Sequence, residues 1–575
     1  MIDGEPLWIS CTPGTDITVP PGCAAILVDG GVEAPTRTTA ELPVGLHSLV
    51  GADGIALGWL AVTPARLESP SRSWAWSVFP LTLRTGASWG TGDFQDLRAF
   101  CDWSGNNGAG YVFLGPTNAG YVTLPVHPSP YSPSSRLFHQ ILLLHPPAIP
   151  GWQDLSPEYK AVSDRADALN AREYMDLDAA LELKMPVLRE LFRLTTPRLS
   201  ARDRDSLAAF QAELGPELRL FALYCAIESE YGQDWRNWPT AMRNPRDALA
   251  CSWSRQNEEL IDFFAWCQWQ LDQQLASAAA AGPGLVRDLP VGTPMNAADA
   301  WMWQECLAPD WRLGAPADYF SPSGHHWDLV PYDPKALAAA GFRPFQLAVR
   351  AALRHAAGIR VDHALGLIRQ FWLPVGGAGD RGHYVAQPTA ALADIICIEA
   401  YRHRAFVVTE ELGNAPIDGL GTFRQRGFLS YDPVIADGFE MRPRGGVVAP
   451  STHDLPTVAG CWTGADTEAL TAAGIPVDAG FAERARARLT ECAQLPAGAA
   501  PGQIIAEVYR WLAASDACLV VVSPEDALGC MTRPNVPGTS DSQWPNFRRR
   551  LPPFAALAAS PGARVLTAIA RRDSQ

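Results

Sequence analysis

Residues 358–363 read Gly-Ile-Arg-Val-Asp-His, a short apolar run that ends in a carboxylate. Two stretches further along the chain repeat this pattern, Val-Val-Thr-Glu-Glu-Leu-Gly at 407–413 and Ser-Thr-His-Asp at 451–454. Parallel strands that close into a barrel present the residues at their carboxyl ends on one common face. The three stretches therefore predict strand ends that bring Asp362, Glu410 and Asp454 to a single site.

Similar β-rich runs recur on both sides of these motifs and alternate with helical patterns. The candidate strands are 75–82, 110–116, 284–291, 358–363, 406–411, 428–434, 446–454 and 518–526. Eight such runs separated by helices are typical of a (β/α)8 TIM barrel. We therefore expect an α/β protein built on this barrel, with helical and loop insertions.

Three regions depart from the alternating pattern. Residues 1–70 contain short apolar stretches between Gly, Pro and Asp turns, which predicts a small antiparallel β domain ahead of a catalytic barrel over 71–575. Long helical patterns at about 150–282 predict a helical insertion on the barrel rim. Residues 292–345 are rich in Pro, Gly and aromatic residues, which favours an active-site loop over a packed element.

Composition excludes several classes of partner. With 46 basic and 61 acidic residues the net charge is −15, which disfavours binding to nucleic acid. No apolar run reaches about 18 residues and the first residues lack a leader pattern, so no membrane partner is expected. The 12 cysteines are scattered without metal-ligand spacing. This pattern favours free thiols in a reducing compartment, hence a cytoplasmic protein without a metal site.

The local chemistry of the first motif fits a nucleophile. Strand alternation puts Arg360 on the same side as Asp362, and a neighbouring guanidinium favours the ionised carboxylate that a nucleophile requires. A buried structural ion pair explains this hexapeptide equally well.

The other two motifs fit supporting roles. Glu410 ends an apolar strand, where proton affinity can rise to suit a general acid, while Glu411 is expected to point to the opposite side. His453 and Asp454 could hydrogen-bond vicinal sugar hydroxyls or simply cap a loop. Together, two carboxylates about 5 to 5.5 Å apart would form a retaining glycosidase-type site.

Further segments carry a resemblance to a known family. They are SWGTGDFQDL (88–97), SPYSPSSRLF (129–138), RDLPVG (287–292), GAPADYFSPSG (314–324), GIRVDHALGLIRQFWLP (358–374), TEELG (409–413), APSTHDLPTVAGCW (449–462) and RPNVPGT (533–539). Through these segments the chain resembles the 4-alpha-glucanotransferases called amylomaltases or disproportionating enzymes, of glycoside hydrolase family 77. The resemblance runs through nearly the whole chain.

The resemblance implies roles for the three carboxylates. Asp362 looks like the family nucleophile, supported by Arg360. Glu410 looks like the general acid and base. Asp454 looks like the transition-state stabiliser that grips the donor sugar, assisted by His453.

It also implies substrate contacts outside the three motifs. Tyr131 matches a tyrosine that stacks near the cleaved bond, and Asn535 matches a polar residue lining the cleft. Asp318 and Trp327 match loop residues over the acceptor side.

The implied reaction is retaining transfer of a 1,4-alpha-glucan segment between sugars through a covalent glycosyl-enzyme. Donors would be maltooligosaccharides or glucans derived from starch or glycogen, and the acceptor would be glucose or another sugar. This chemistry needs no metal and no organic cofactor.

Several positions differ from the family pattern, among them Gln140 near an expected asparagine and the three that follow. His325, in Gly-His-His-Trp-Asp at 324–328, stands where a glutamine is common, and Asn296 stands where an acidic residue is usual. Glu411 stands where aspartate is common. Because none of these is one of the three carboxylates, we expect intact chemistry with an altered donor or acceptor preference.

Two alternatives stay open at this point. An alpha-glucan hydrolase of the alpha-amylase type shares the barrel and the carboxylates, but lacks SPYSPSSRLF, GAPADYF and RPNVPGT. A glucan-binding protein that has lost catalysis is the alternative from another class, and the intact carboxylates argue against it.

Overall fold

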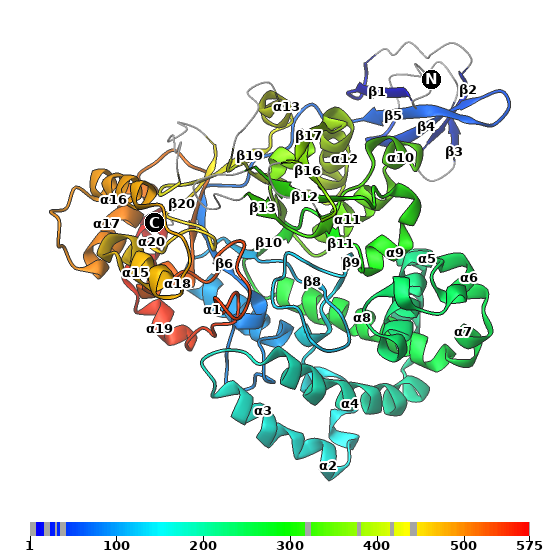
Figure 1. The fold of residues 1–575 in the computed structure, drawn as a ribbon, viewed down its shortest axis with the longest axis horizontal. Coiled ribbons are helices and arrows are strands. Elements are labelled where there is room, and N and C mark those ends of the chain that lie inside the picture. Colours follow the sequence, from blue (N-terminus) through cyan, green and yellow to red (C-terminus); the bar gives the residue numbers. More distant parts are fainter. Residues whose placement is uncertain are drawn as a thin grey trace.

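The computed structural model describes residues 7–15, 23–28, 32–34, 42–316, 324–376, 381–413, 419–436 and 445–573. A closed barrel stands at the centre, and Figure 1 shows a small blue sheet at one corner and helices around the rim. The N-terminal sheet lies beside α12 (Thr389–Arg402), whereas the C-terminus lies among the helices at the opposite end of the view (Figure 1).

The barrel consists of eight parallel strands. They are β6 (Ser73–Val78), β7 (Tyr111–Leu114), β10 (Gly284–Leu289), β15 (Gly358–Val361), β18 (Phe406–Glu410), β19 (Leu429–Pro433), β20 (Val447–Ala449) and β21 (Leu519–Val522), neighbours in this order and closed by β21 on β6. Seven of the predicted runs contain one of these strands and the run at 75–82 overlaps β6, so the predicted barrel is confirmed. The observed strands are shorter than predicted, and Asp454 lies five residues beyond β20.

Alternation along these strands separates the barrel interior from the helical layer. Inward positions form one apolar cluster, which comprises Ala75, Phe113, Val286, Phe406, Val408, Leu429, Tyr431, Val447, Ala449, Leu519 and Val521. The intervening residues, such as Val361 and Val407, pack against the outer helices. Because side chains alternate with a period of two, Asp362 and Glu410 continue the inward-facing rows at the carboxyl ends of β15 and β18.

The helices cover the barrel and extend its rim. They are α1 (Phe94–Asn106), α2 (Pro157–Lys160), α3 (Val162–Asn170), α4 (Leu177–Thr195), α5 (Ala201–Tyr231), α6 (Pro245–Ala250), α7 (Ser252–Gln256), α8 (Glu258–Ala279), α9 (Ala298–Met302), α10 (Pro334–Ala339), α11 (Arg343–Leu353), α12, α13 (Leu420–Gln425), α14 (Val458–Thr463), α15 (Ala465–Ala472), α16 (Ala479–Ala493), α17 (Pro501–Ala513), α18 (Pro524–Leu528), α19 (Phe554–Ala558) and α20 (Pro561–Asp573).

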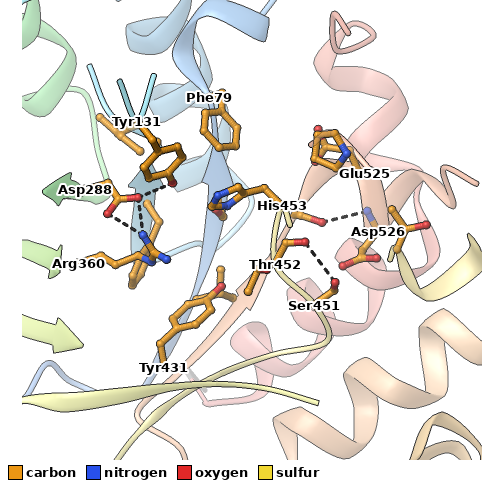
Figure 2. Close-up of a pocket in the computed structure, with 18 residues that line it drawn as sticks. Phe79, Tyr131, Asp288, Arg360, Tyr431, Ser451, Thr452, His453, Glu525 and Asp526 are labelled. Carbon is orange, nitrogen blue, oxygen red and sulfur yellow. Dashed lines mark hydrogen bonds and ion pairs between the residues drawn. The ribbon is translucent and has the colours of Figure 1, made fainter. Parts of the chain in front are cut away.

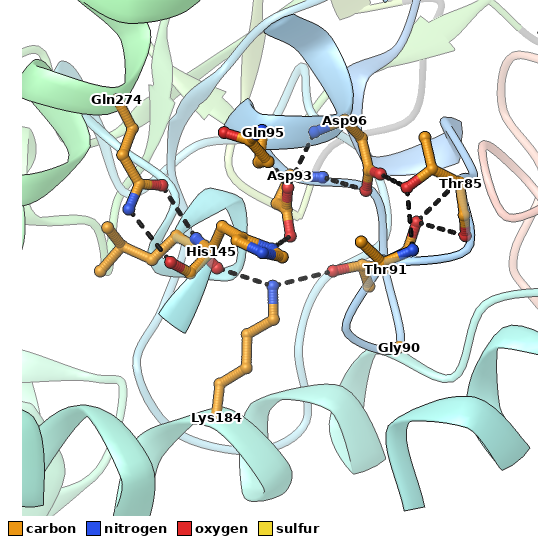
Figure 3. Close-up of polar contacts among 12 residues, drawn as sticks. Thr85, Gly90, Thr91, Asp93, Gln95, Asp96, His145, Lys184 and Gln274 are labelled. Atoms are coloured by element: carbon orange, nitrogen blue, oxygen red, sulfur yellow. Dashed lines mark hydrogen bonds and ion pairs between the residues drawn. The ribbon is translucent and has the colours of Figure 1, made fainter. Parts of the chain in front are cut away.

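Helices α2 to α8 occupy most of the region predicted as a helical insertion. Of these, α8 packs against both α1 and α5 and leads into β10, so it joins the insertion to the barrel wall. Lys184 on α4 is buried and reaches into the barrel-side loops, where its ammonium donates to the carbonyl of Leu144 at 2.9 Å (Figure 3). This hydrogen bond fixes the position of α4 against those loops.

The region 292–345 is more ordered than a loop. It holds β11 (Thr293–Pro294), β12 (Trp311–Ala315), β13 (His325–His326) and β14 (Leu329–Val330), besides α9, α10 and the start of α11. Strand β12 pairs with β16 (Arg369–Pro374), which in turn pairs with β17 (His383–Ala386). The prediction of an irregular loop was wrong here because β11 pairs with β14 and β12 pairs with β16, about 60 residues away, and a local pattern cannot reveal such distant pairings.

The N-terminal sheet contains β1 (Leu7–Cys11), β2 (Cys23–Val28), β3 (Val32–Ala34), β4 (Gly45–Gly51) and β5 (Ala56–Val62), in the order β1-β5-β4-β2-β3. Its pairs are antiparallel as predicted, except that β1 runs parallel to β5. The sheet contacts α12 through β1, β4 and β5. The predicted domain limit near residue 70 lies between β5 and β6 and stays a prediction.

Short β8 (Asn118–Ala119) and β9 (Ser135–His139) form a separate hairpin-like pair.

None of the twelve cysteines forms a disulfide, and all of them lie in the described ranges. Across those ranges, no helix combines the length and the apolar character needed to span a membrane.

Candidate active site

A buried ion cluster stands at the carboxyl ends of β10 and β15. Arg360 Nη1 donates to Asp362 Oδ1 at 2.9 Å and to both carboxylate oxygens of Asp288, at 2.7 and 2.8 Å. The side chains of Arg360, Asp288 and Asp362 are 11%, 5% and 18% exposed. One guanidinium therefore holds two carboxylates, and Asp362 is the more exposed of the two.

Glu410 ends β18 beside this cluster. Its carboxylate accepts hydrogen bonds from the backbone N–H of His363, at 3.0 Å, and of Leu412. The first of these donors follows Asp362 directly in the chain, so the two carboxylates are neighbours. Burial raises the pKa of Glu410, and Asp454 adds to the rise while Arg360 opposes it.

Glu411 points away from the cleft, as predicted. Its carboxylate pairs with Arg424 on α13, with 2.7 Å between Arg424 Nη2 and Oε1. The carboxylate that raises the pKa of Glu410 is therefore Asp454 and not its sequence neighbour.

Asp454 stands on a turn after β20. Asn535 Nδ2 donates to Asp454 Oδ1 at 2.6 Å, and the backbone N–H of Asn535 donates to the carbonyl of His453. Arg533 donates to the Asp454 carbonyl at 2.8 Å while its guanidinium pairs with buried Asp466. With 42% of its side chain exposed, Asp454 projects from a well-anchored turn into open space.

Aromatic rings line one wall of the cleft. The rings of Tyr131 and His453 stack with 5.0 Å between centroids and 11° between planes, and Phe79 and Phe547 pack around them. Tyr131 also donates its hydroxyl to Asp288 Oδ2 at 2.7 Å. The wall thus connects the ion cluster of β10 and β15 to the turn that carries Asp454.

Some of these groups, including Phe79, Tyr131, Asp288, Arg360 and His453, line a common cavity, drawn in Figure 2, whereas Asp362, Glu410 and Asp454 are not among its lining residues. Tyr131, Asp288 and Arg360 lie on one side of it, and Ser451, Thr452 and His453 approach from the other (Figure 2). Two further acids, Glu525 and Asp526, also line the cavity. Burial raises the pKa of Glu525 to about 7 and that of Asp526 to about 6.

The rim segment 324–328 contacts the Asp362 end of the cleft. The indole of Trp327 meets the ring of His363 edge-on, with 5.0 Å between centroids. His325 is buried on β13. The pKa of His363 is lowered mainly by burial, and the neighbouring His325 adds to this effect. Two of the predicted rim residues thus lie beside the residue that follows Asp362.

The remaining predicted residues are more remote or are not described. Asn296 accepts the hydroxyl of Tyr121 at 2.8 Å and holds Tyr224 through its backbone carbonyl, so it joins the rim to α5. Asp318 lies outside the described residues.

The pKa of Asp362 reflects more neighbours than the Arg360 guanidinium alone. Burial raises the pKa of this carboxyl to about 8, the guanidinium opposes the rise, and Asp288, Glu410 and Asp454 add to it. Arg360 thus favours the ionised form, as expected from the sequence, while the three neighbouring acids act against it. Acids this close together can share a proton between them.

Asp288 is the polar residue that sequence reasoning missed. It lies within RDLPVG, at a strand end, and so carries the same signal as Asp362 and Glu410. Within the described part of the chain, no group of three His, Cys, Asp or Glu side chains could hold a metal ion.

Comparison with known proteins matches the chain to one enzyme family. The family model described as 4-alpha-glucanotransferase, glycoside hydrolase family 77, matches residues 78–556. The chain belongs to glycoside hydrolase family 77.

Curated relatives in family 77 extend over most of the chain. The 4-alpha-glucanotransferase of Mycobacterium tuberculosis is 34% identical over 565 residues, which covers 90% of this chain and 77% of the relative. That of Haemophilus influenzae is 28% identical over 450 residues, covering 72% and 64%.

Solved structures of amylomaltases have the same fold as this family 77 chain. The amylomaltase of Corynebacterium glutamicum superposes with a TM-score of 0.83 at 25% identity, covering 98% of this chain and 90% of that one. The Streptococcus agalactiae amylomaltase, solved with acarbose, has a TM-score of 0.71 at 16% identity, covering 88% and 99%. At that identity the second likeness concerns the fold alone.

Proposed function

We propose that this chain is a retaining 4-alpha-glucanotransferase that moves a 1,4-alpha-glucan segment from one maltooligosaccharide to another sugar. The observation that carries the proposal is the grouping of Asp362 and Glu410 at neighbouring strand ends, with Asp454 facing them. Membership of family 77 supports alpha-glucans as the substrates.

In the first step, we assign Asp362 as the nucleophile and Glu410 as the acid. The carboxylate of Asp362 attacks the anomeric carbon, the glycosidic C–O bond breaks, and Glu410 gives its proton to the leaving oxygen. In the second step, the 4-hydroxyl of the acceptor gives its proton to Glu410 and displaces Asp362 from the anomeric carbon. The products are a lengthened sugar and the original enzyme.

The shared proton resides on Glu410 in this assignment. Arg360 contacts Asp362 at 2.9 Å and so favours its ionised form, whereas no guanidinium contacts Glu410 among the interactions of the described residues. The opposite ionisation states of two adjacent acids are what a retaining mechanism requires.

Asp454 and the aromatic wall hold the donor sugar in this account. Asn535 fixes Asp454 at one oxygen, which leaves the other for sugar hydroxyls. Tyr131 and His453 support that side through their stacked rings. These contacts strengthen as charge develops on the sugar ring, which lowers the barrier.

Transfer exceeds hydrolysis only if the acceptor sugar displaces water from the second step. We propose that Trp327 and His325, beside His363, form part of the acceptor side together with Asp318. His325 and Asn296 would then set a donor or acceptor preference of this chain's own. We also propose a cytoplasmic enzyme, in keeping with twelve cysteines that form no disulfide.

Incubation with maltotriose tests the proposal. Purified protein should release glucose and maltooligosaccharides longer than maltotriose, while the number of reducing ends stays constant. A steady rise in reducing ends would instead indicate a hydrolase, and unchanged maltotriose would indicate another donor or a binding protein.

A further inference from the structure

Two successive glutamates at the end of β18 face opposite sides. Glu410 lies beside Asp362, where it accepts the backbone N–H of His363, whereas Glu411 lies behind the strand with only 5% of its side chain exposed. There it accepts the hydroxyl of Thr409 at 2.6 Å and contacts Arg424 Nη2 through both of its carboxylate oxygens. The ion pair therefore fixes the backbone immediately after Glu410.

That backbone in turn orients the Glu410 carboxylate. The N–H of Leu412 donates to Glu410 Oε1, and the N–H of His363 donates to Oε2 at 3.0 Å. Since Leu412 follows Glu411, a shift of the Glu411 side chain would move one of the two donors. The other donor belongs to the neighbouring strand end and would stay in place.

We propose that Glu411 is a positioning residue for Glu410, acting through its ion pair with Arg424 and the N–H of Leu412. This inference rests on the proposed role of Glu410 as the acid and base. A carboxyl that must reach a leaving oxygen within hydrogen-bond distance depends on its orientation, and a misplacement of about 1 Å can cost about 10²-fold in rate.

A second ion pair fixes the helix that carries Arg424. Arg426, directly after α13, donates through Nε to Asp394 Oδ1 at 2.9 Å. Asp394 is fully buried on α12 and also accepts the indole N–H of Trp8 at 3.0 Å. The N-terminal sheet and α12, through Arg426, and Glu411, through Arg424, thus both hold the C-terminal end of α13.

The leaving group separates positioning from general stability. A maltotriose donor needs its leaving oxygen protonated. Fluoride leaves without an acid because hydrogen fluoride is a much stronger acid than a sugar hydroxyl. Glu411→Gln should therefore lower kcat on maltotriose by about 10- to 100-fold. Single-turnover release of fluoride from alpha-maltotriosyl fluoride should stay within about threefold of the unchanged enzyme, because it depends on the nucleophile alone.

Two further variants sharpen the assignment. Glu411→Asp keeps the charge, and Arg424 is exposed enough, at 32%, to follow the shorter side chain. It should retain most of the maltotriose activity. Arg424→Met should repeat the defect of Glu411→Gln, and the double variant should be no worse than either, since both changes break the same contact.

Glu217→Gln supplies the matched control. Glu217 is also buried and paired with an arginine, Arg343 at 2.6 Å, but on α5, away from β18. Its loss should lower thermal stability and leave the ratio of maltotriose to fluoride rates unchanged.

Equal losses on both donors in Glu411→Gln, or no loss on either, would overturn the inference. If the unchanged enzyme is active while Glu411→Gln gives one of these results, the proposed function still stands. Failure of the unchanged enzyme to convert maltotriose would instead count against the proposed function itself.

Discussion

Two buried acidic clusters in this molecule use similar residues for different ends. The cluster at the barrel mouth comprises Asp288, Arg360, Asp362 and Glu410. The other, drawn in Figure 3, comprises Asp93, Asp96, His145 and Lys184 around the start of α1. Both pack acids into the protein interior, yet only the first contributes side chains, those of Asp288 and Arg360, to the lining of the cavity in Figure 2.

The Figure 3 cluster is satisfied by the protein itself. Asp93 accepts the backbone N–H groups of Gln95 and Asp96, each at 3.0 Å, and its other oxygen meets His145 Nδ1 at 2.8 Å. Asp362 accepts one hydrogen bond among the interactions of the described residues, from Arg360. A fully bonded acid stabilises a fold, whereas an acid with unused acceptor capacity and a partly exposed side chain, as Asp362 has, is able to react.

The largest contrast between the clusters should come from Asp362→Asn. Because an amide cannot attack the anomeric carbon, we expect kcat on maltotriose to fall by about 10⁴- to 10⁶-fold, the scale found when a covalent nucleophile is removed. The thermal midpoint should hardly change, and glucan binding should persist in calorimetry. An unchanged rate would remove Asp362 from the mechanism.

Glu410→Gln should have the next largest effect. Loss of general acid and base catalysis costs about 10²- to 10⁴-fold, so turnover of maltotriose should fall by that factor. With alpha-maltotriosyl fluoride as the donor, whose leaving group needs no acid, added azide should restore part of the turnover as a small nucleophile that needs no base, and should form an alpha-glycosyl azide. If azide gives no such product from that donor, Glu410 is not the base.

Tyr131→Phe should have a moderate effect. The change removes the hydroxyl that Asp288 accepts at 2.7 Å but keeps the ring that stacks on His453. A hydrogen bond to a charged group contributes about 1.5 to 3 kcal/mol, so kcat/KM should fall by about 10- to 100-fold. Tyr131→Ala should be worse because it also removes the ring, and equal losses would contradict a separate role for the hydroxyl.

The smallest effect on activity, but a clear one on stability, is expected from Asp96→Asn in the Figure 3 cluster. Burial, with the charge of Asp93, raises the pKa of Asp96 to about 7, so the folded state favours its protonated form. That contribution to stability is present below the unfolded pKa of about 3.9 and is lost as pH rises through about 7.

Asparagine cannot ionise, so the variant should keep this stability at higher pH. Urea unfolding at pH 5 and pH 8 should show the free energy of unfolding of the unchanged protein falling relative to the variant by on the order of 2 kcal/mol. A parallel pH dependence of the two proteins would contradict the raised pKa. Activity per folded molecule should stay unchanged throughout.

The sequence was sufficient to predict the barrel because each of its strands is a short apolar run that can be recognised locally. It also located Asp362 and Glu410, since each stands directly at a strand end. It was insufficient for β12 and β16, whose pairing joins distant segments. The contact of Asn535 with Asp454 joins residues 81 apart, so only the family resemblance pointed to it.

Burial was the other quantity that the sequence did not contain. The pattern around Arg360 predicted an ionised Asp362, but it did not contain the burial and the three neighbouring acids that raise the pKa of this carboxyl against the guanidinium. Asp288, the most important of the missed residues, stands at a strand end as Asp362 and Glu410 do. Its place in the site became clear only from its hydrogen bonds to Tyr131 and Arg360 in the structure.

The most direct test of the account is to trap the intermediate. Glu410→Gln, mixed with alpha-maltotriosyl fluoride in the absence of an acceptor, should form a glycosyl-enzyme that is released slowly because its base is missing. Peptide mass spectrometry should then find one maltotriosyl unit on the peptide that contains Asp362, and none after Asp362→Asn. An adduct on another residue, or fluoride release without any adduct, would contradict the assignment of Asp362 as the nucleophile.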